Sequence, residues 1–575
     1  MNKVQRLLDR HAGPLVVLAV FLLGVGIRVW GMGFGLPYLY HPDEPNNIEI
    51  AQRILQTGDL NPHFYHYSPF YFYLNAAAYL PYVAIQLVRG VPPAKTIGGL
   101  LPLDMRLPGT GFTAQPLTVL IGRAVSVVFG SLCVVLVYLL AMKMFRSRIA
   151  AGLAALFVAV SPELAAHSRV MTPDTLVVFF CVLNAYYSID VLRRGNRADY
   201  MLAGAAGALA ASAKYGAAVV LVVPALAHVL ANGFGGGLKN TRIWLTVVAA
   251  VLTFVLLNPP AVLYSREFYS GITSGVTNYA TGHAGMEGGA PSWYLGYFWW
   301  SEGLIAVLGL VGMIVWSLRE PKEGLLLAAF PVVYFCVISS LVVRNDRTAI
   351  PITPFLYLFC VGLLSVLWKS RPANAIRTEW VRIAVLILVG LMLAFSTMSL
   401  VQTMGDLLNV DARETSRVWI EQNIDPGAKI GIEAYDPYLD KRFVHVTLVG
   451  VQYDLPWYQQ HGFDYVILSR GSYGRFFREP ELYKYTVHDY KRRFSEFELV
   501  KIFDDTRSEP WIYRLLRSFR DRAQSAQFWD GFMEIRIYRV PPVKSNGWNL
   551  VAPRALRNAS IRRYQRAGPM PAWRA

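Results

Sequence analysis

The sequence predicts a polytopic α-helical membrane protein of about eleven transmembrane helices, followed by a C-terminal extracytoplasmic α/β domain. Hydrophobic residues make up 54% of the 575 residues and charged residues only 16%. Apolar windows of about 20 residues, the length that crosses roughly 30 Å of hydrocarbon, recur up to residue 402. Mixed polar and apolar patterns follow. We therefore divide the chain into a membrane part at 1–402, an α/β domain at 403–543 and a basic, flexible tail at 544–575.

Eleven apolar windows are interpreted as spans. The first is expected to stay in the membrane, because no small-x-small cleavage site follows its long apolar run. The stretch 68–88 is also apolar, but its tyrosines suit the membrane interface, and counting it as a span would place the next basic loop outside. The stretch 200–230 is too long for one span with Lys214 at its middle, so we expect a hairpin broken at "AKYG". The predicted spans cover 13–30, 117–142, 149–166, 174–192, 200–213, 215–231, 243–258, 297–317, 323–341, 348–368 and 381–401.

Basic residues predict the orientation of these spans. Lys3, Arg6 and Arg10 precede the first span, and five later basic loops fall on the same side of the membrane with this count. We expect that side to be cytoplasmic and the chain to be a multi-pass protein of the inner (plasma) membrane. Orientation signals and attraction to anionic lipids explain most of the net charge of +17, so no nucleic-acid partner is expected.

Asp43 and Glu44 stand in the predicted first external loop, 31–116. A hydrated loop is the usual explanation of such a pair. Here Pro42 and Pro45 restrict the backbone on both sides, and apolar segments hold the pair near the interface. Because burial and like charge raise the pKa of a carboxyl group toward working pH, we predict that Asp43 is a general base and Glu44 its orienting partner.

Asp174 follows "SRVMTP" at the start of an apolar span. We expect Thr172 to be the helix N-cap and Pro173 the first helical residue, with Asp174 in the first turn. Capping alone explains Asp174 about as well as a functional role, in which it hydrogen-bonds a sugar or helps a cation to bind phosphate. Arg169 and His167 just before it are either ordinary interfacial residues or, for Arg169, part of the substrate site.

Cationic side chains on the same outer side complete the predicted site. Lys214 lies at the hairpin turn, Arg344 and Arg347 lie at the outer end of another span, and Arg123 is a weaker candidate. Each alone could be a snorkelling residue. Together they would neutralise a phosphate or diphosphate at the interface, where low dielectric strengthens charged hydrogen bonds. A carboxylate base beside such cations indicates displacement at the anomeric carbon of a lipid-phosphate sugar.

No cofactor is expected. The sequence contains neither the GxxxxGK[ST] nucleotide motif nor the HExxH metal motif. Four histidines, His41, His63, His66 and His283, would lie outside the cytoplasm. A divalent ion therefore stays an open alternative, although their spacing matches no specific metal site.

Two further regions could contribute to the site. The glycine-rich, aromatic stretch 261–296 is interpreted as a loop, either a movable cover over the substrate or a plain connection. Its lining candidates are His283, Glu287, Trp293 and Tyr294. In the α/β domain the patterns predict an amphipathic helix at 412–423 and strands at 429–434, 463–469, 499–503 and 533–540. This domain would cover the active site, where it either binds the acceptor or only stabilises the membrane part.

Residues 40–74, "YHPDEPNNIEIAQRILQTGDLNPHFYHYSPFYFYL", resemble the first external loop of the GT-C class membrane glycosyltransferases. The resemblance is strongest to the bacterial branch related to protein O-mannosyltransferases and to the lipid A aminoarabinose transferase, glycosyltransferase families 39 and 83. Weaker matches follow in chain order, at "HSRVMTPDTLVVFF", "SAKYGAAVVLVVP", "RNDRTAIPITPFL" and "WDGFMEIRIYRV".

This resemblance implies a GT-C fold, a polyprenyl-phosphate sugar donor and an inverting single displacement at the outer membrane face. By motif, Asp43 matches the proposed base, Asp174 the acidic residue of the second loop, and Arg344 or Arg347 a phosphate-binding arginine. The aminoarabinose transferases carry a lysine before a proline pair in the first loop. This chain has Tyr67 there, so His66 or Lys214 would replace that lysine, and the donor sugar stays open. His66 and Tyr67 are both expected to bind the substrate, as is His283.

The sequence thus predicts a glycosyltransferase that moves one sugar from a polyprenyl-phosphate donor to a hydroxyl acceptor outside the cytoplasm. The expected partners are this donor, membrane lipids and a lipid, glycan or protein acceptor. One alternative is a polytopic transporter or flippase for lipid-linked sugars, although the inverted repeats common in transporters are not evident. A noncatalytic scaffold is another.

Overall fold

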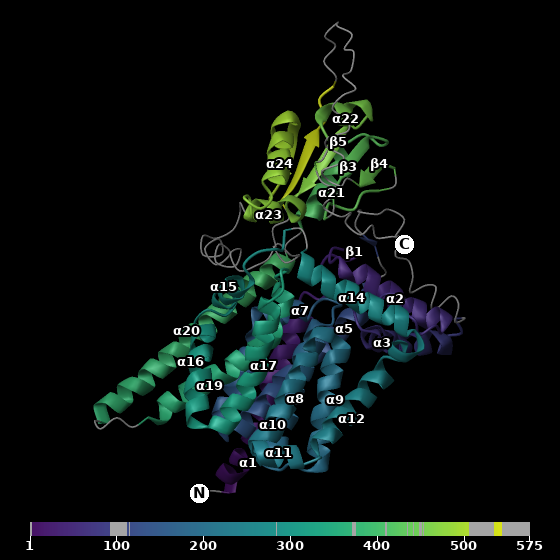
Figure 1. Ribbon diagram of the computed structural model, residues 1–575. Helices are drawn as coiled ribbons and strands as arrows, with labels where there is room; N and C mark the ends of the chain where they lie inside the picture. Colours follow the sequence, from purple (N-terminus) through teal and green to yellow (C-terminus); the bar gives the residue numbers. More distant parts are fainter. Residues whose placement is uncertain are drawn as a thin grey trace.

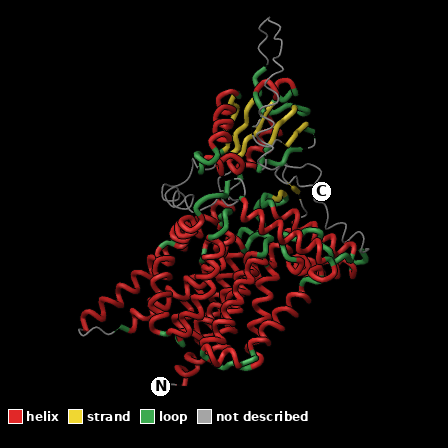
Figure 2. Tube along the Cα trace, viewed as in Figure 1, coloured by secondary structure: helices red, strands yellow, loops and turns green. Residues whose placement is uncertain are grey.

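A computed structural model describes residues 3–91, 112–113, 116–282, 285–370, 375–408, 411–433, 435–440, 442–447, 451, 453–504 and 534–542. Long helices form a bundle, and most of the strands gather in a separate layer at one end of it (Figures 1 and 2). Helix α1 (Lys3–Val29) begins at the opposite end of the bundle. The predicted tail at 544–575 lies outside the described residues.

The helical part contains short helices as well as long ones. In chain order its further helices are α2 Asp43–Thr57, α3 Pro69–Val88, α5 Pro116–Phe145, α6 Arg148–Val160, α7 Pro162–His167, α8 Asp174–Arg193, α9 Arg197–Ala213, η1 Tyr215–Leu221, α10 Val222–Asn232, α11 Phe234–Lys239, α12 Ile243–Leu257, α13 Pro260–Leu263, α14 Ser265–Thr281, α15 Ala290–Glu302, α16 Leu304–Arg319, α17 Pro321–Ser339, α18 Asp346–Ala349, η2 Ile350–Ile352, α19 Thr353–Lys369 and α20 Ala375–Leu408. Two short strands, β1 (Tyr38–Leu39) and β2 (Phe112–Thr113), pair antiparallel.

Small residues let the helices of the bundle approach closely. A Cβ atom on Gly204 of α9 would lie 2.3 Å from the carbonyl oxygen of Thr246 on α12. On Gly312 of α16 it would lie 2.1 Å from the carbonyl oxygen of Phe359 on α19. Helices that pack through such small residues are typical of membrane proteins, where van der Waals contact between backbones replaces the hydrophobic effect.

The chain is a multi-pass membrane protein. Among the described residues, six helices are long and apolar enough to cross a bilayer, and a seventh span results if α15 and α16 count as one broken span. Shorter apolar helices occupy Gly13–Val29, Arg148–Val160 and Ile243–Leu257. Apolar side chains such as Leu22, Leu252 and Leu386 are more than half exposed, as a surface that faces lipid requires. The number eleven stays a prediction.

Two breaks in the helices test the predicted spans. The break at "AKYG" is confirmed: α9 ends at Ala213, Lys214 is extended, and η1 begins at Tyr215. The span predicted at 297–317 is not one continuous helix, because the chain bends by 116° between α15 and α16. Gly303 forms this corner with φ of 57°, a backbone conformation that glycine adopts at little cost. Helix α3, predicted to lie at the interface, is not among the long apolar helices described above.

The C-terminal part contains a five-stranded mixed sheet with strand order β4-β3-β5-β7-β6. Strand β3 pairs parallel with β4 and β5, whereas β7 pairs antiparallel with β5 and β6. Side chains alternate between two buried clusters, since Ile467 joins one and its neighbours Val466 and Leu468 join the other. The elements are α21 Ala412–Asn423, β3 Lys429–Ile432, β4 Val444–Thr447, α22 Leu455–Gln460, β5 Tyr465–Ser469, α23 Arg470–Arg478, α24 Lys484–Glu496, β6 Glu498–Phe503 and β7 Ile535–Arg539.

Some predicted elements of these regions are confirmed and others are wrong. The helix predicted at 412–423 is α21, and four predicted strands correspond to β3, β5, β6 and β7. Strand β4 was not predicted. The stretch 261–296, interpreted as a loop, contains the 17-residue helix α14. Its glycines misled the interpretation, because Gly271 serves close packing: a Cβ there would lie 2.6 Å from the Cβ of Tyr65.

Candidate active site

Asp43 lies in the first turn of α2, at the end of the bundle that faces the C-terminal sheet (Figure 1). Its Oδ2 atom accepts a hydrogen bond of 2.8 Å from the hydroxyl of Tyr67. The same oxygen forms an ion pair with Nη1 of Arg347, 304 residues later in the chain. This Nη1 also lies 3.4 Å from the Tyr67 hydroxyl oxygen. The predicted base and one predicted phosphate-binding arginine therefore meet directly.

The short helix α18 aims Arg347 at this position. Asn345 is its N-cap, and the Asn345 side chain accepts a hydrogen bond of 2.9 Å from the backbone N–H of Arg347. The Asp346 carboxylate accepts from the same N–H at 2.7 Å. Such a capped turn fixes the backbone and leaves the guanidinium free to reach α2.

The Asp43 carboxyl group has a lowered pKa, which corrects the expectation that burial and like charge would raise it. Burial alone would raise the pKa, but the positive charge of Arg347 and the hydrogen bonds from Arg347 and Tyr67 outweigh it. The neighbouring His41 is buried, and burial lowers its own pKa. Its Nδ1 atom accepts a hydrogen bond of 3.3 Å from the backbone N–H of Asp43.

A second ion pair, between Asp174 and Lys214, neighbours the first. Nζ of Lys214, at the break after α9, lies 3.1 Å from Oδ1 of Asp174, the first residue of α8. Asp174 also interacts electrostatically with Arg347 and Tyr67. The predicted capping is wrong: α8 begins at Asp174, and the Thr172 hydroxyl has no hydrogen-bond partner in the described part of the chain. Asp174 thus faces a cation.

Glu44 has different neighbours from those predicted. Its carboxylate accepts two hydrogen bonds from Arg123, of 2.8 and 2.7 Å, and a third of 3.0 Å from the backbone N–H of Met171. Both charged side chains are fully buried. No bond to Asp43 is present among these contacts, so the geometry makes Glu44 an anchor between α2, α5 and the segment before α8.

Arg169 also holds the scaffold together. Its guanidinium donates hydrogen bonds of 2.8 Å to the carbonyl oxygens of Trp30 and Ile27, at the C-terminal end of α1. Arg123 likewise donates to the carbonyl oxygens of Met32 and Phe34, at 2.6 and 3.0 Å. These two arginines satisfy backbone groups at the entry to the first loop.

Arg344 contacts the C-terminal part, and no bond between Arg344 and Asp43 is present among the described residues. It forms an ion pair with Glu479, in the connection between α23 and α24, and its guanidinium carbon lies 5.9 Å from the Trp293 ring centre. In the same region the Tyr483 hydroxyl accepts a hydrogen bond of 2.8 Å from the backbone N–H of Gly285 and donates one to Glu287. The C-terminal part therefore holds the segment 285–289 in place.

Residues of the first loop also contact the C-terminal part. The Arg413 guanidinium carbon of α21 lies 3.9 Å from the ring centre of Tyr40, whose hydroxyl donates to Glu414 at 3.3 Å. Arg417 lies 5.0 Å over the Tyr38 ring. The sequence did not single out these residues, nor Glu479 and Tyr483. The sequence around an arginine or a tyrosine does not indicate which distant residue its side chain will contact.

The remaining predicted histidines do not join the two ion pairs. His66 is exposed, and its ring centre lies 5.1 Å from that of Phe64. His63 is also exposed, with Nε2 3.3 Å from Asp59 and Nδ1 3.8 Å from Glu267. His283 lies outside the described residues. The nearby Tyr294 is fully buried against the backbone N–H of Asn345.

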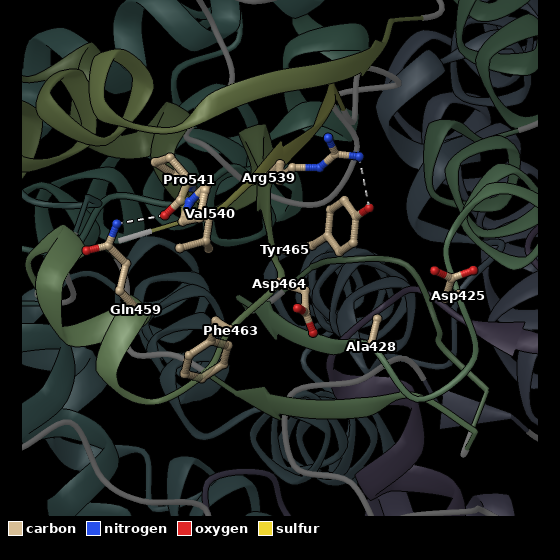
Figure 3. Close-up of a pocket in the computed structure, with 10 residues that line it drawn as sticks. Asp425, Ala428, Gln459, Phe463, Asp464, Tyr465, Arg539, Val540 and Pro541 are labelled. Atoms are coloured by element: carbon tan, nitrogen blue, oxygen red, sulfur yellow. Dashed lines mark hydrogen bonds between the residues drawn. The ribbon is translucent and has the colours of Figure 1, made fainter. Parts of the chain in front are cut away.

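Figure 3 shows a pocket in the C-terminal part. Two hydrogen bonds join lining residues to each other: Gln459 donates to the Pro541 carbonyl at 2.7 Å, and Arg539 donates to the Tyr465 hydroxyl at 3.4 Å. The pocket contains no residue of the predicted site. Its lining residues are Asp425, Ala428, Gln459, Phe463, Asp464, Tyr465, Arg539, Val540, Pro541 and Pro542.

One family model and several solved structures are similar to this chain. Residues 118–261 match the family model of the dolichyl-phosphate-mannose-protein mannosyltransferases. The apo oligosaccharyltransferase of Archaeoglobus fulgidus has a similar structure, with a TM-score of 0.50 over 86% of this chain and 73% of that one, at 11% sequence identity. The chain has the fold of a GT-C class glycosyltransferase. Residues 118–261 are similar to the protein O-mannosyltransferases.

Other comparisons are weaker. ArnT from Cupriavidus metallidurans, bound to undecaprenyl phosphate, matches with a TM-score of 0.49 and 14% identity, over 92% of this chain and 98% of that one. The Pmt1-Pmt2 complex of S. cerevisiae, bound to its sugar donor, matches with a TM-score of 0.31 and 17% identity, over 50% of this chain and 36% of that one. A search of curated protein sequences gave no significant match.

Proposed function

We propose that this protein is an inverting glycosyltransferase that moves one sugar from a polyprenyl-phosphate donor to a hydroxyl acceptor outside the cytoplasm. The main observation behind the proposal is the ion pair between Asp43 and Arg347. This pair places a carboxylate base next to a cation that would bind phosphate. The match of residues 118–261 to enzymes named for a dolichyl-phosphate-mannose substrate supports it.

In the proposed reaction, Asp43 accepts the proton of the acceptor hydroxyl. The acceptor oxygen attacks the anomeric carbon, and the bond from that carbon to the phosphate oxygen breaks. The electron pair of this bond leaves with the lipid phosphate, whose charge Arg347 and Lys214 stabilise. One displacement from the opposite face inverts the anomeric configuration. Asp174 and Tyr67 orient these two cations and the base.

Arg347 would bind both Asp43 and the donor phosphate, and this competition explains how donor binding activates the base. Without donor, Arg347 pairs with Asp43 and keeps the carboxyl pKa low, so Asp43 is a weak base. A bound phosphate competes for the same guanidinium, and the pairing with Asp43 weakens. The pKa of Asp43 then rises, and its basicity increases only when the leaving group is in place.

We place the site at the extracytoplasmic face of the inner membrane, with eleven spans, the N-terminus in the cytoplasm and the C-terminal α/β domain outside. The bias of lysine and arginine toward the other loops supports this orientation. A cysteine placed at the exposed position Val500 would react with a membrane-impermeant maleimide in intact spheroplasts. Labelling only after lysis would refute the orientation.

Purified protein supplied with a panel of radiolabelled polyprenyl-phosphate sugars and membrane extract tests the function. We expect the label to move from one of these donors to an acceptor, with release of the lipid phosphate. Movement of intact donor across a vesicle membrane without any transfer would favour a flippase instead. The matched control is the Asp43→Asn variant in the same vesicles.

A further inference from the structure

Three potential metal ligands gather next to the turn that carries Arg347. Glu163 and His167 lie four residues apart, on one face of α7, and Asp346 begins α18, much later in the chain. One donor atom from each lies within 4.8 Å of the others. Their exposed fractions are 5%, 1% and 1%. None of the three was a predicted site residue.

Among the described residues the two carboxylates of this cluster have no close ion-pair partner, although the more distant charge of Arg347 acts on Asp346. Within the described chain, neither Glu163 nor Asp346 forms an ion pair within 4.0 Å. Each accepts one hydrogen bond, Glu163 from the Tyr297 hydroxyl at 3.3 Å and Asp346 from the backbone N–H of Arg347 at 2.7 Å. Two charged carboxylates buried side by side cost several kcal/mol each, in order of magnitude, unless a cation or a proton compensates them.

A third buried carboxylate adds to the negative charge. Glu302 is 1% exposed and interacts electrostatically with Glu163. Its Oε2 atom accepts a hydrogen bond of 2.6 Å from Tyr357, whereas Oε1 has no hydrogen-bond partner among the described residues. A single shared proton would leave much of this charge uncompensated. A divalent cation would offset two of these three negative charges.

The donor set suits a divalent transition ion. Two carboxylate oxygens and one imidazole nitrogen are ligands that Zn²⁺ and Mn²⁺ accept. Ligand bonds of about 2.0–2.2 Å bring donor atoms to roughly 3–4 Å from one another, so the cluster needs only small side-chain shifts.

Two of the potential ligands are already oriented by hydrogen bonds from neighbouring groups. The Tyr297 hydroxyl holds Glu163, and the backbone N–H of Arg347 holds Asp346, as outer-shell hydrogen bonds do in metal sites. An ion here would tie α18 to α7. It would therefore fix the turn that carries Arg347, without touching Asp43.

We propose that Glu163, His167 and Asp346 form a binding site for one divalent transition cation, of the Zn²⁺ or Mn²⁺ type, that anchors α18 to α7. The site does not depend on the proposed sugar transfer. Failure of transfer assays would leave it standing, and failure to bind metal would leave the transfer proposal standing.

Metal binding tests this proposal. Full-length protein carrying a histidine-free affinity tag would be purified in detergent, stripped with EDTA, loaded with Mn²⁺ and desalted. We expect about one bound Mn²⁺ per chain by elemental mass spectrometry. His167→Gln and Asp346→Asn should each lower the affinity at least about tenfold. Electron spin echo modulation from a bound imidazole nitrogen should be present in the wild type and absent in His167→Gln.

The matched control is His63→Gln, because His63 also lies near two carboxylates but is exposed. It should bind Mn²⁺ as the wild type does. Where Asp346→Asn fails to fold, Glu163→Gln carries the same expectation and leaves the α18 cap unchanged. Absence of Mn²⁺ and Zn²⁺ uptake by the wild type would overturn the proposal. Equal uptake by wild type and folded cluster variants would overturn it as well, since the ion would then bind elsewhere.

Discussion

The environment of Asp43 depends on one distant contact. The sequence neighbour Glu44 led us to expect a raised pKa for the Asp43 carboxyl group, because burial and like charge favour the protonated form. Arg347, 304 residues away, holds the carboxyl pKa below its ordinary value. The predicted direction of the pKa shift was therefore wrong, although the predicted pairing of Asp43 with a cation is present.

The lowered pKa of Asp43 predicts the acid side of the pH–rate profile. In the free enzyme the carboxylate stays charged until the pH falls below the ordinary aspartate value of about 3.9, so kcat/KM should stay level from neutral pH down to about 5. The acid limb of kcat should lie at higher pH, because bound phosphate draws Arg347 away. A limb of kcat/KM above about pH 6 would show that Asp43 is not the free-enzyme base.

The buried Glu44–Arg123 pair predicts a stability effect. Glu44→Gln leaves the Arg123 charge buried without its partner, and the loss of one member of such a pair costs about 3–5 kcal/mol. The melting temperature in detergent should fall clearly. Glu267→Gln, at an exposed position, is the matched control and should melt like the wild type. An unchanged melting temperature in Glu44→Gln would contradict the anchoring role.

Among the elements, the segment 285–289 shows how the C-terminal part acts on the helical part. Arg344 pairs with Glu479 on one side of this segment, and Tyr483 binds Gly285 and Glu287 on the other. The backbone N–H of Arg344 also donates to the Met286 carbonyl at 3.0 Å. This segment and the turn that carries Arg347 are therefore held together.

Removal of one hydroxyl should loosen this segment. Tyr483→Phe loses the hydrogen bond to the Gly285 N–H, which is worth about 1 kcal/mol, so hydrogen exchange at Gly285 should speed up roughly fivefold. Tyr485→Phe is the matched control, because Tyr485 is 74% exposed. Equal protection of Gly285 in the wild type and in Tyr483→Phe would show that the C-terminal part does not hold the segment.

The elements best predicted from the sequence are those with a strong local pattern. Helix α21 has the amphipathic period and a clear stop after it, and its bounds agree with the prediction. Strand β4 has only four residues and was missed. Helix α14 was missed because glycine composition suggested a loop, whereas Gly271 is needed for its contact with Tyr65. The helix forms because of its tertiary packing, and a short stretch of sequence does not reveal this packing.

For the whole molecule, the sequence predicted a membrane bundle with a C-terminal α/β part, and the GT-C fold followed from resemblance. The alternation of basic loops predicted which segments lie on the same side of the membrane. On this basis Asp43 and Arg347 were predicted to lie at the same end of the bundle. It could not tell Arg347 from Arg344, because both follow the same span. Only the turn of α18 directs one toward α2 and the other toward Glu479.

The rate of sugar transfer by Asp43→Asn tests most directly whether these distant residues form one catalytic site. Asp59→Asn, an exposed change in the same loop, is the matched control. Under single-turnover conditions we expect Asp43→Asn to transfer at least about 100-fold more slowly than the wild type. It should still bind the lipid-phosphate donor, because Arg347 and Lys214 remain. Transfer by Asp43→Asn at a rate close to that of Asp59→Asn would contradict a catalytic role for Asp43.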